Sequence, residues 1–243
     1  MCTPFSRTEL LLGQAALERL ERARVAIFGV GGVGGSVVEA LARSGVGALE
    51  LVDSDTVSVS NLNRQILATV PDIGRPKVEV ARERVLSINP RAEVVPHNCF
   101  FLPETAERFD FSRYDYVVDA IDTVSGKIEL VLRAQAAGVP ILCSMGAGNK
   151  LDPSLFRVSD LSRTSVDPLA RVMRQALRKR GITHLKCVWS PEPPLTPKGI
   201  PADAPPGRRA PGSVAFVPPA AGLVLAGEVV RDLAGLSEPT IPH

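Results

Sequence analysis

Short apolar runs alternate with segments of helical periodicity through the first 145 residues. The apolar runs predict buried strands at 24–28, 48–52, 93–96, 116–121 and 140–145. Apolar residues recur at helical spacing over 33–44, 78–88 and 127–137, between those strands. This alternation predicts an α/β fold of the Rossmann-like type, a mostly parallel sheet with helices on both faces.

The pattern changes after residue 145. Strand-like stretches at 155–158 and 187–190 bracket one more helix, which predicts a C-terminal extension of mixed strands. Ten of the 21 prolines fall in 190–219, so this part is expected to be a long Pro-rich loop that crosses the molecule. We expect a single domain over residues 1–243 that contains this loop.

Residues 210–227 form an uncharged stretch of 18 residues, which reaches the length of a membrane span. Prolines and glycines interrupt it, so we expect a loop, a short strand at 214–217 and the start of a buried helix. The N-terminus lacks the cationic, apolar and cleavable pattern of a secretory signal. Both observations favour a cytoplasmic protein with no membrane association.

Composition narrows the class further. The chain has 243 residues, 45% apolar and 22% charged, with a net charge of +2, which fits an ordinary globular protein. This balance excludes a largely disordered chain and a protein that is basic over its whole surface. The four cysteines, Cys2, Cys99, Cys143 and Cys187, form no CxxC pair, so we expect reduced thiols and no zinc.

A glycine-rich turn follows the first predicted strand and opens the first predicted helix. Gly29, Gly31, Gly32 and Gly34 lie in this turn, where backbone N–H groups and a helix N-terminus suit a phosphate. Asp53 ends the next strand 19 residues after Gly34, about the spacing at which a carboxylate meets a ribose hydroxyl. A nucleotide is therefore expected, and NAD and ATP both satisfy this part of the pattern.

Charged and amide side chains beyond the second strand favour ATP. Asp55, Asn61 and Arg64 follow the strand directly, and Lys77 stands at the start of the next helix. Cations at these places suit a triphosphate whose charge develops during reaction, whereas an NAD-dependent dehydrogenase would need an acid–base pair for which the sequence offers no candidate. Asp122 ends the fourth strand, where its carboxylate could hold Mg²⁺.

The stretches GxGGxG, LVDSDxVxxSNLNRQ, GRPKVE and DAID together resemble the ubiquitin-activating-enzyme-like superfamily, over about residues 5–233. The resemblance implies a homodimer that adenylates a carboxylate with ATP and Mg²⁺. It implies that Gly32 contacts phosphate and that Asp53 holds the ribose. The triphosphate would be lined by Asn61, Arg64 and Lys77, and Asp122 would organise Mg²⁺. Arg7 would reach the ATP of the partner subunit.

Three stretches of the second half, 144–153, 160–171 and 190–193, look like the tRNA threonylcarbamoyladenosine dehydratase branch of that superfamily. The resemblance implies that ATP activates the threonyl carboxylate of a modified adenosine next to the anticodon. Internal attack then closes an oxazolone ring and releases AMP. A monovalent cation and a sulfur-relay protein are further components that the resemblance leaves open.

Charge in the second half agrees with an RNA substrate. Residues 168–186 carry six basic residues and no acidic one, while the remainder carries 22 basic against 26 acidic residues, a net charge of −4. Arg171, Arg174 and Arg178 fall on one helical face, opposite an apolar face of Leu169, Val172, Met173 and Ala176. We expect these arginines, with Lys179 and Arg180, to contact tRNA phosphates. A solvated helix without a partner is the alternative.

Two other functions remain open from the sequence. One is an adenylyltransferase that activates the C-terminal carboxylate of a small ubiquitin-like sulfur carrier, although its bacterial members usually carry CxxC zinc pairs that are missing here. The other is a protein that binds nucleotide without catalysis. The presence of Arg64, Lys77 and Asp122 argues against that second alternative.

Overall fold

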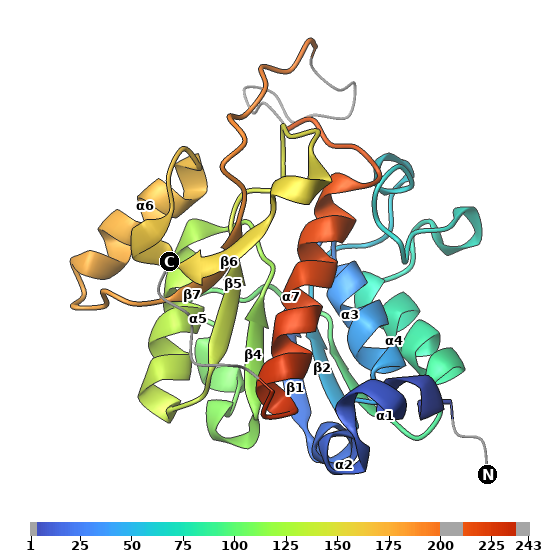
Figure 1. Ribbon diagram of the computed structural model, residues 1–243. Helices are drawn as coiled ribbons and strands as arrows, with labels where there is room; N and C mark the ends of the chain where they lie inside the picture. The colour runs from blue at the N-terminus through green and yellow to red at the C-terminus, as the bar shows by residue number, and fades with distance from the viewer. Residues whose placement is uncertain (1–3, 200–210, 237–243) are drawn as a thin grey trace.

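A single seven-stranded sheet organises the chain. The computed structural model describes residues 4–199 and 211–236, with the strands in the order β3-β2-β1-β4-β5-β7-β6 (Figure 1). The strands are β1 (Arg24–Phe28), β2 (Ala48–Val52), β3 (Glu93–His97), β4 (Tyr116–Asp119), β5 (Ile141–Ser144), β6 (Arg157–Asp160) and β7 (Lys186–Trp189). Every pairing is parallel except that of β6 with β7. The predicted mostly parallel sheet with a mixed extension is therefore confirmed.

Helices cover both faces of this sheet. They are α1 (Ser6–Leu12), α2 (Gln14–Arg22), α3 (Gly34–Arg43), α4 (Lys77–Ile88), α5 (Val124–Ala137), α6 (Pro168–Arg178) and α7 (Val217–Leu233). Single 3-10 turns occur at Val59–Asn61, Val70–Asp72, Ala106–Arg108, Phe111–Arg113, Pro153–Leu155 and Leu161–Arg163. The alternation along β1 shows how the two cores form. Val25 and Ile27 pack with α3, α4 and α7, whereas Ala26 and Phe28 pack with α5 on the other face.

Helices α3 and α7 lie side by side on the front of the sheet in Figure 1. Gly222 of α7 makes this close approach possible, because a Cβ there would lie 2.3 Å from the carbonyl oxygen of Val33. Val33 belongs to the glycine-rich turn. The C-terminal helix therefore supports the turn that was predicted to bind a nucleotide.

Three expectations from the sequence differ from the structure. The strand expected at 214–217 is wrong: residues 211–216 are irregular and α7 begins at Val217, with Pro218 and Pro219 in its first turn, where proline needs no donor. The strands expected at 116–121 and 140–145 are shorter, as β4 and β5 show, and the strand expected at 155–158 lies two residues later, as β6, after the 3-10 turn Pro153–Leu155. Helices α1 and α2 were not expected at all.

The Pro-rich loop expected over 190–219 is irregular over 190–199 and 211–216, whereas residues 217–219 form the first turn of α7. Its middle, 200–210, lies outside the described residues. Across the part of the chain that the structure covers, no helix combines the length and apolar character that a bilayer span needs. Helix α7, which takes up much of the uncharged stretch, has 17 residues.

Candidate nucleotide-binding site

A cavity of about 520 Å³ opens at the carboxyl ends of β1, β2 and β4. This is the edge at which parallel α/β sheets bind their ligands. Its walls come from the glycine-rich turn, the segments after β2 and β4, the N-terminus of α4, the loop after β5 and the end of the Pro-rich loop that leads into α7. Of the sequence-predicted residues, the cavity is lined by Gly29, Gly31, Gly32, Asp53, Asp55, Asn61, Arg64, Lys77 and Asp122.

The glycine-rich turn is packed too tightly for side chains at two positions. Gly29 has a φ of 91°, and a Cβ there would lie 2.6 Å from the carbonyl oxygen of Ala120. At Gly34 a Cβ would lie 1.7 Å from the carbonyl oxygen of Gly29. This close approach packs the start of α3 against the turn after β1. Gly34 is not among the residues that line the cavity, and its expected ligand contact stays a prediction. Gly31 has open space, with its nearest neighbour 3.8 Å away, and it borders the cavity.

Asp53 connects the glycine-rich turn to the segment after β2. Its Oδ2 accepts a hydrogen bond from the backbone N–H of Val30 at 2.7 Å, and its Oδ1 accepts one from the N–H of Asp55 at 2.8 Å. These two bonds fix the carboxylate beside the turn. The orientation suits a ligand whose hydroxyl groups lie next to its phosphates.

Lys77 brings a buried ammonium group into the cavity. It is the first residue of α4, its side chain is 7% exposed, and its Nζ lies 2.7 Å from Oδ2 of Asp55. The backbone N–H of Lys77 also donates to the carbonyl oxygen of Asp55 at 3.0 Å. Because the Asp55 carboxylate is 58% exposed, it can move aside without leaving a buried charge when an anion approaches the lysine.

Asn61 and Arg64 are held by their own loop. Asn61 is buried, and its Oδ1 accepts from the N–H of Ser58 at 3.1 Å, which caps the 3-10 turn Val59–Asn61. Nη1 of Arg64 donates to the carbonyl oxygen of Ser60 at 2.8 Å and to Oδ1 of Asn63 at 3.0 Å. The guanidinium is therefore kept at the cavity wall by neutral groups, with its charge available to a ligand.

Asp122 is exposed at the rim of the cavity, and a fully buried ion pair supports it from behind. Asp119 and Lys127 are both 0% exposed, with Nζ 2.9 Å from Oδ2 of Asp119, and Nζ also donates to the carbonyl oxygen of Ile121 at 3.0 Å. The pair fixes the turn from β4 into α5. Nothing in the sequence pattern indicates this role of Lys127, because a lysine in a helix usually faces solvent.

The donor groups fit a magnesium ion that is shared with a nucleotide. In residues 4–199 and 211–236 no group of three or more His, Cys, Asp or Glu side chains comes together as a metal site. Mg²⁺ with a nucleotide needs only one or two carboxylates in addition to the phosphates, and Asp122 offers one at the cavity.

The buried thiols are poor nucleophiles. Cys143 and Cys187 are neighbours on β5 and β7 and are fully buried. Burial raises the pKa of Cys187 to about 12 and raises that of Cys143 as well. Cys187 thus packs the core as a small apolar side chain. Cys99 is half-buried and lines the cavity.

Both ends of the Pro-rich loop are tied to the segment after β5. Oδ1 of Asn149 accepts from the N–H of Gly212 at 2.6 Å, and the N–H of Asn149 donates to the carbonyl oxygen of Gly212 at 2.8 Å. Nζ of Lys150, which is buried, donates to the carbonyl oxygens of Ser190 and Glu192 at 3.3 and 2.7 Å. The Glu192 carboxylate in turn accepts from the N–H groups of Leu151 and Asp152. These contacts hold the loop against the cavity.

Arg7 lies far from the cavity of its own chain. It is exposed, and it is not among the residues that line the cavity. Its helix, α1, lies at the lower end of the sheet in Figure 1, whereas α7, whose Pro218 lines the cavity, begins at the upper end. Two neighbouring apolar side chains on the same helix, Leu10 and Leu11, are 82% and 88% exposed.

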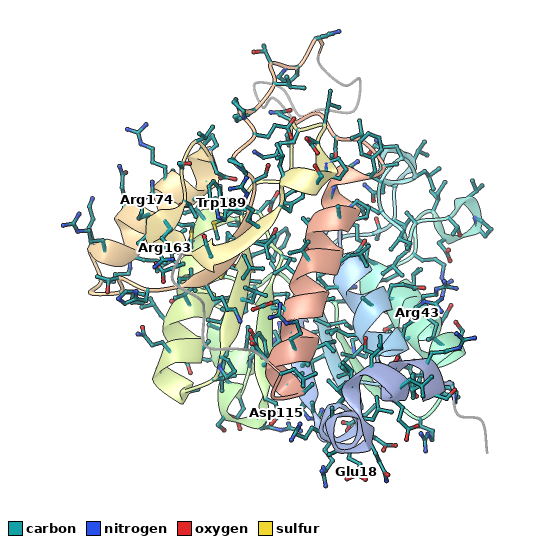
Figure 2. All side chains as sticks on the ribbon, viewed as in Figure 1. Glu18, Arg43, Asp115, Arg163, Arg174 and Trp189 are labelled. Atoms are coloured by element: carbon teal, nitrogen blue, oxygen red, sulfur yellow. The ribbon has the colours of Figure 1, made fainter. Side chains whose placement is uncertain are left out.

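Helix α6 carries the basic residues, but its faces differ from the expected ones. The buried side is formed by Ala170, Met173 and Leu177, whereas Val172, expected on the apolar face, is 45% exposed. Arg174 folds back onto the turn Leu161–Arg163, and its Nη1 donates to the carbonyl oxygens of Leu161 and Thr164. Figure 2 labels Arg174 on α6 just above Arg163 of this turn. Arg174 is therefore partly a structural residue.

The other cations of this region are free of local acids. Arg171, Arg178, Lys179 and Arg180 are exposed, and none of them forms an ion pair with any residue that the structure describes. We call these four residues the cationic patch. Lys186 does not belong to it, because its Nζ pairs with Glu228 and Asp232 of α7 at 2.7 Å.

Known proteins resemble this chain over nearly its full length. A Bacillus subtilis (strain 168) protein named tRNA threonylcarbamoyladenosine dehydratase is 44% identical over 242 residues, covering 96% of this chain and 95% of that protein. The crystal structure of the E. coli tRNA N6-threonylcarbamoyladenosine dehydratase in complex with ATP has a TM-score of 0.86 at 33% identity, covering 96% and 94% of the two chains.

A Thermus thermophilus sulfur carrier protein adenylyltransferase is less similar, at 30% identity over 232 residues, which cover 96% of this chain and 77% of that protein. The ThiF family matches residues 5–242. The match spans the glycine-rich turn, the residues that line the cavity and the Pro-rich segment before α7. The chain therefore belongs to the ThiF family.

Proposed function

We propose that this chain is an ATP-dependent tRNA threonylcarbamoyladenosine dehydratase. In this reaction the threonyl carboxylate attacks the α-phosphorus of ATP and pyrophosphate leaves. A nucleophile of the same modified nucleoside then attacks the acyl carbon, the ring closes and AMP leaves. The observation that carries the proposal is the cavity in which a glycine-rich turn, a fixed Asp53 and the side chains of Arg64 and Lys77 face one space. An ATP-bound relative with the same fold supports it.

Each cavity residue has a task that its geometry favours. Asp53 accepts hydrogen bonds from the ribose hydroxyls, and the N–H groups around Gly31 and Gly32 face the phosphates. Lys77 leaves Asp55 for the triphosphate, and Arg64 and Asn61 contact its oxygens from the loop after β2. The two cations reduce the repulsion between the attacking carboxylate and the α-phosphate, and they stabilise the charge of the transition state.

Asp122 is the residue of this chain that would hold Mg²⁺ together with the phosphates. Bound there, the ion would neutralise part of the triphosphate charge. The buried pair of Asp119 and Lys127 keeps the Asp122 turn in place without touching the ligand.

The cationic patch favours tRNA as the carrier of the carboxylate. Exposed cations without local acids suit a polyanion, and counterion release makes such contacts strong at low salt. Arg174 is left out of the patch because it is half-buried and its Nη1 is bonded to backbone oxygens, which leaves only Nε and Nη2 for a ligand. The competing substrate is the C-terminal carboxylate of a small sulfur carrier, as the name of the Thermus relative suggests.

A homodimer completes the proposal. Arg7 lies away from its own cavity, and Leu10 and Leu11 leave an apolar surface on the same helix. In the dimer α1 would pack on the partner subunit and bring Arg7 to the partner's ATP.

The reaction takes place in the cytoplasm, where its tRNA substrate is found. A monovalent cation or a sulfur-relay protein can be added to the assay as separate variables.

The test measures AMP release with threonylcarbamoyladenosine-containing tRNA, with a sulfur-carrier protein, and with neither. We expect AMP only with the tRNA, together with loss of one water from the modified nucleoside in mass spectra of digested tRNA. AMP release that depends on the sulfur carrier and ignores tRNA would select the alternative. Nucleotide binding without AMP under any condition would exclude both enzymes.

A further inference from the structure

A second cavity of about 370 Å³ lies between α6, the turn Leu161–Arg163 and the segment 182–185. Its back wall is apolar and consists of Leu161, Leu177, Ile182 and Leu185, which also pack in the core of this part of the molecule. Its mouth is polar and exposed and consists of Ser162, Arg178, Thr183 and His184. A pocket of this size with an apolar wall and a few polar groups has the general form of a small-ligand site.

The donors at the mouth favour an anion. Arg174 lines the cavity, and its Nε and Nη2 have no hydrogen-bond partner within the described residues, since only Nη1 bonds to the turn. Arg178 belongs to the cationic patch. The acid beside the mouth, Asp160, is already engaged: its carboxylate accepts from the N–H groups of Ser162 and Leu185 and lies 3.3 Å from Nδ1 of His184.

Helix α6 connects the two cavities. Its N-cap residue, Asp167, is buried, and its Oδ1 accepts from the N–H of Ala170 at 2.9 Å while its Oδ2 accepts from the N–H of Gly146 at 3.1 Å. Gly146 directly precedes Ala147 and Gly148, which line the first cavity. The helix has 11 residues and is therefore about 16 Å long. The second cavity lies at its far half, so one extended polyanion can reach both.

We propose that the second cavity binds one nucleotide of the substrate tRNA, a short distance along the chain from the nucleoside that enters the first cavity. The base lies against the apolar wall, and its phosphate is bound by Arg178 and the free edge of Arg174. This combination suits an unstacked nucleotide of a single-stranded loop, which offers a flat apolar base and an anion together. The inference rests on the proposed function. It adds a second contact site for the RNA, and α6 fixes the distance between this site and the first cavity.

The test uses substitutions that fill the second cavity and leave the first cavity unchanged. Thr183→Trp and Ser162→Trp place an indole at two different sides of the mouth, and Arg178→Ala removes the phosphate contact. Each of these positions is exposed, so the fold should tolerate the change. Arg82→Ala is the matched control, because Arg82 is an exposed arginine on α4, outside both cavities.

Steady-state dehydration of the modified tRNA and tRNA binding at several salt concentrations give the readout. We expect the KM for tRNA to rise about tenfold in both tryptophan variants, with kcat and the KM for ATP unchanged. Arg178→Ala should lower the slope of log K against log salt by about one. The Arg82→Ala protein should match the wild type.

Two negative results remain distinguishable. If the wild-type protein neither binds nor converts the modified tRNA, the proposed function fails. If the wild type converts the tRNA, but both tryptophan variants keep the KM for tRNA and Arg178→Ala keeps the salt slope, the second cavity is not an RNA site and this inference alone is overturned. Thermal unfolding of every variant checks that the fold is retained.

Discussion

In the proposed reaction, Lys77 is the residue on which the use of ATP depends most directly. Lys77→Met keeps the length and the buried packing of the side chain but removes its charge, and Asp55 stays solvated, so the fold should persist. We expect kcat/KM for ATP to fall by about 10²- to 10³-fold, because a preorganised charge at a developing anion contributes about 3–4 kcal/mol. The rate of AMP release at several ATP concentrations measures this fall in kcat/KM. Arg82→Met, on the same helix, should have no effect, and an unchanged rate in Lys77→Met would refute the assignment.

Lys127 affects stability rather than ligand contact. Lys127→Met leaves the Asp119 carboxylate charged and unpaired at 0% exposure. Removal of one partner from a buried pair costs about 3–5 kcal/mol, so the free energy of unfolding in urea should fall by that amount. The double variant Asp119→Asn with Lys127→Met should recover much of the loss, because no buried charge remains. A single variant as stable as the wild type would contradict the role of this pair.

Individual residues of the site show what the sequence could and could not predict. The positions of Gly29, Asp53 and Lys77 at the cavity were predictable, because each residue belongs to a local pattern of strand, turn and helix. Lys150 and Glu192 were not, because their partners lie about 40 residues away along the chain. Which backbone carbonyls face a buried ammonium is decided by the packing of two loops, and no periodicity in the sequence encodes it.

At the scale of elements, the contact of α3 with α7 controls the glycine-rich turn. Gly222→Ala would place a Cβ 2.3 Å from the Val33 carbonyl and 2.7 Å from Cβ of Ser36, so the helices must separate. We expect the free energy of unfolding to fall by about 1–3 kcal/mol and the affinity for ATP to weaken. Gly227→Ala on the same helix meets nothing within 4 Å and should stabilise by about 0.5–1 kcal/mol. Equal effects of the two variants would contradict this packing argument.

An ion pair between Glu39 of α3 and Arg84 of α4 joins these two helices. Burial works to raise the pKa of Glu39, but hydrogen bonds from Arg84 and Arg43 outweigh it and hold the pKa below its usual value. The lowered pKa means that this group stabilises the fold above the pKa of the unfolded chain, and the contribution disappears as the pH falls through the folded pKa. Glu39→Gln should therefore be less stable than the wild type at neutral pH. The difference should shrink in urea unfolding below about pH 4.

The bounds of helices and strands show a second limit to what the sequence can predict. Apolar runs predicted β1 and β2 with their observed bounds, since a buried parallel strand needs a continuous apolar run. The same argument misplaced a strand at 214–217, because a short apolar run is equally consistent with the entry to a buried helix, and α7 starts there. Helix α1 was missed because its apolar residues, Leu10, Leu11 and Leu12, are consecutive and do not recur at helical spacing.

At the scale of the whole molecule, the remote position of Arg7 gives the proposed dimer a direct test. If Arg7 acts on the partner's ATP, the single variants Arg7→Ala and Lys77→Met should each be nearly inactive as homodimers. When the two are unfolded, mixed in equal amounts and refolded, half of the dimers are expected to be mixed, and one of their two cavities combines an intact Lys77 with an intact Arg7. AMP release should then recover to about a quarter of the wild-type rate. Mixing Lys77→Met with a protein that carries both substitutions is the control, and it should stay inactive. Absence of recovery in the first mixture, with mixed dimers verified by native mass spectrometry, would show that Arg7 does not act on the partner's ATP.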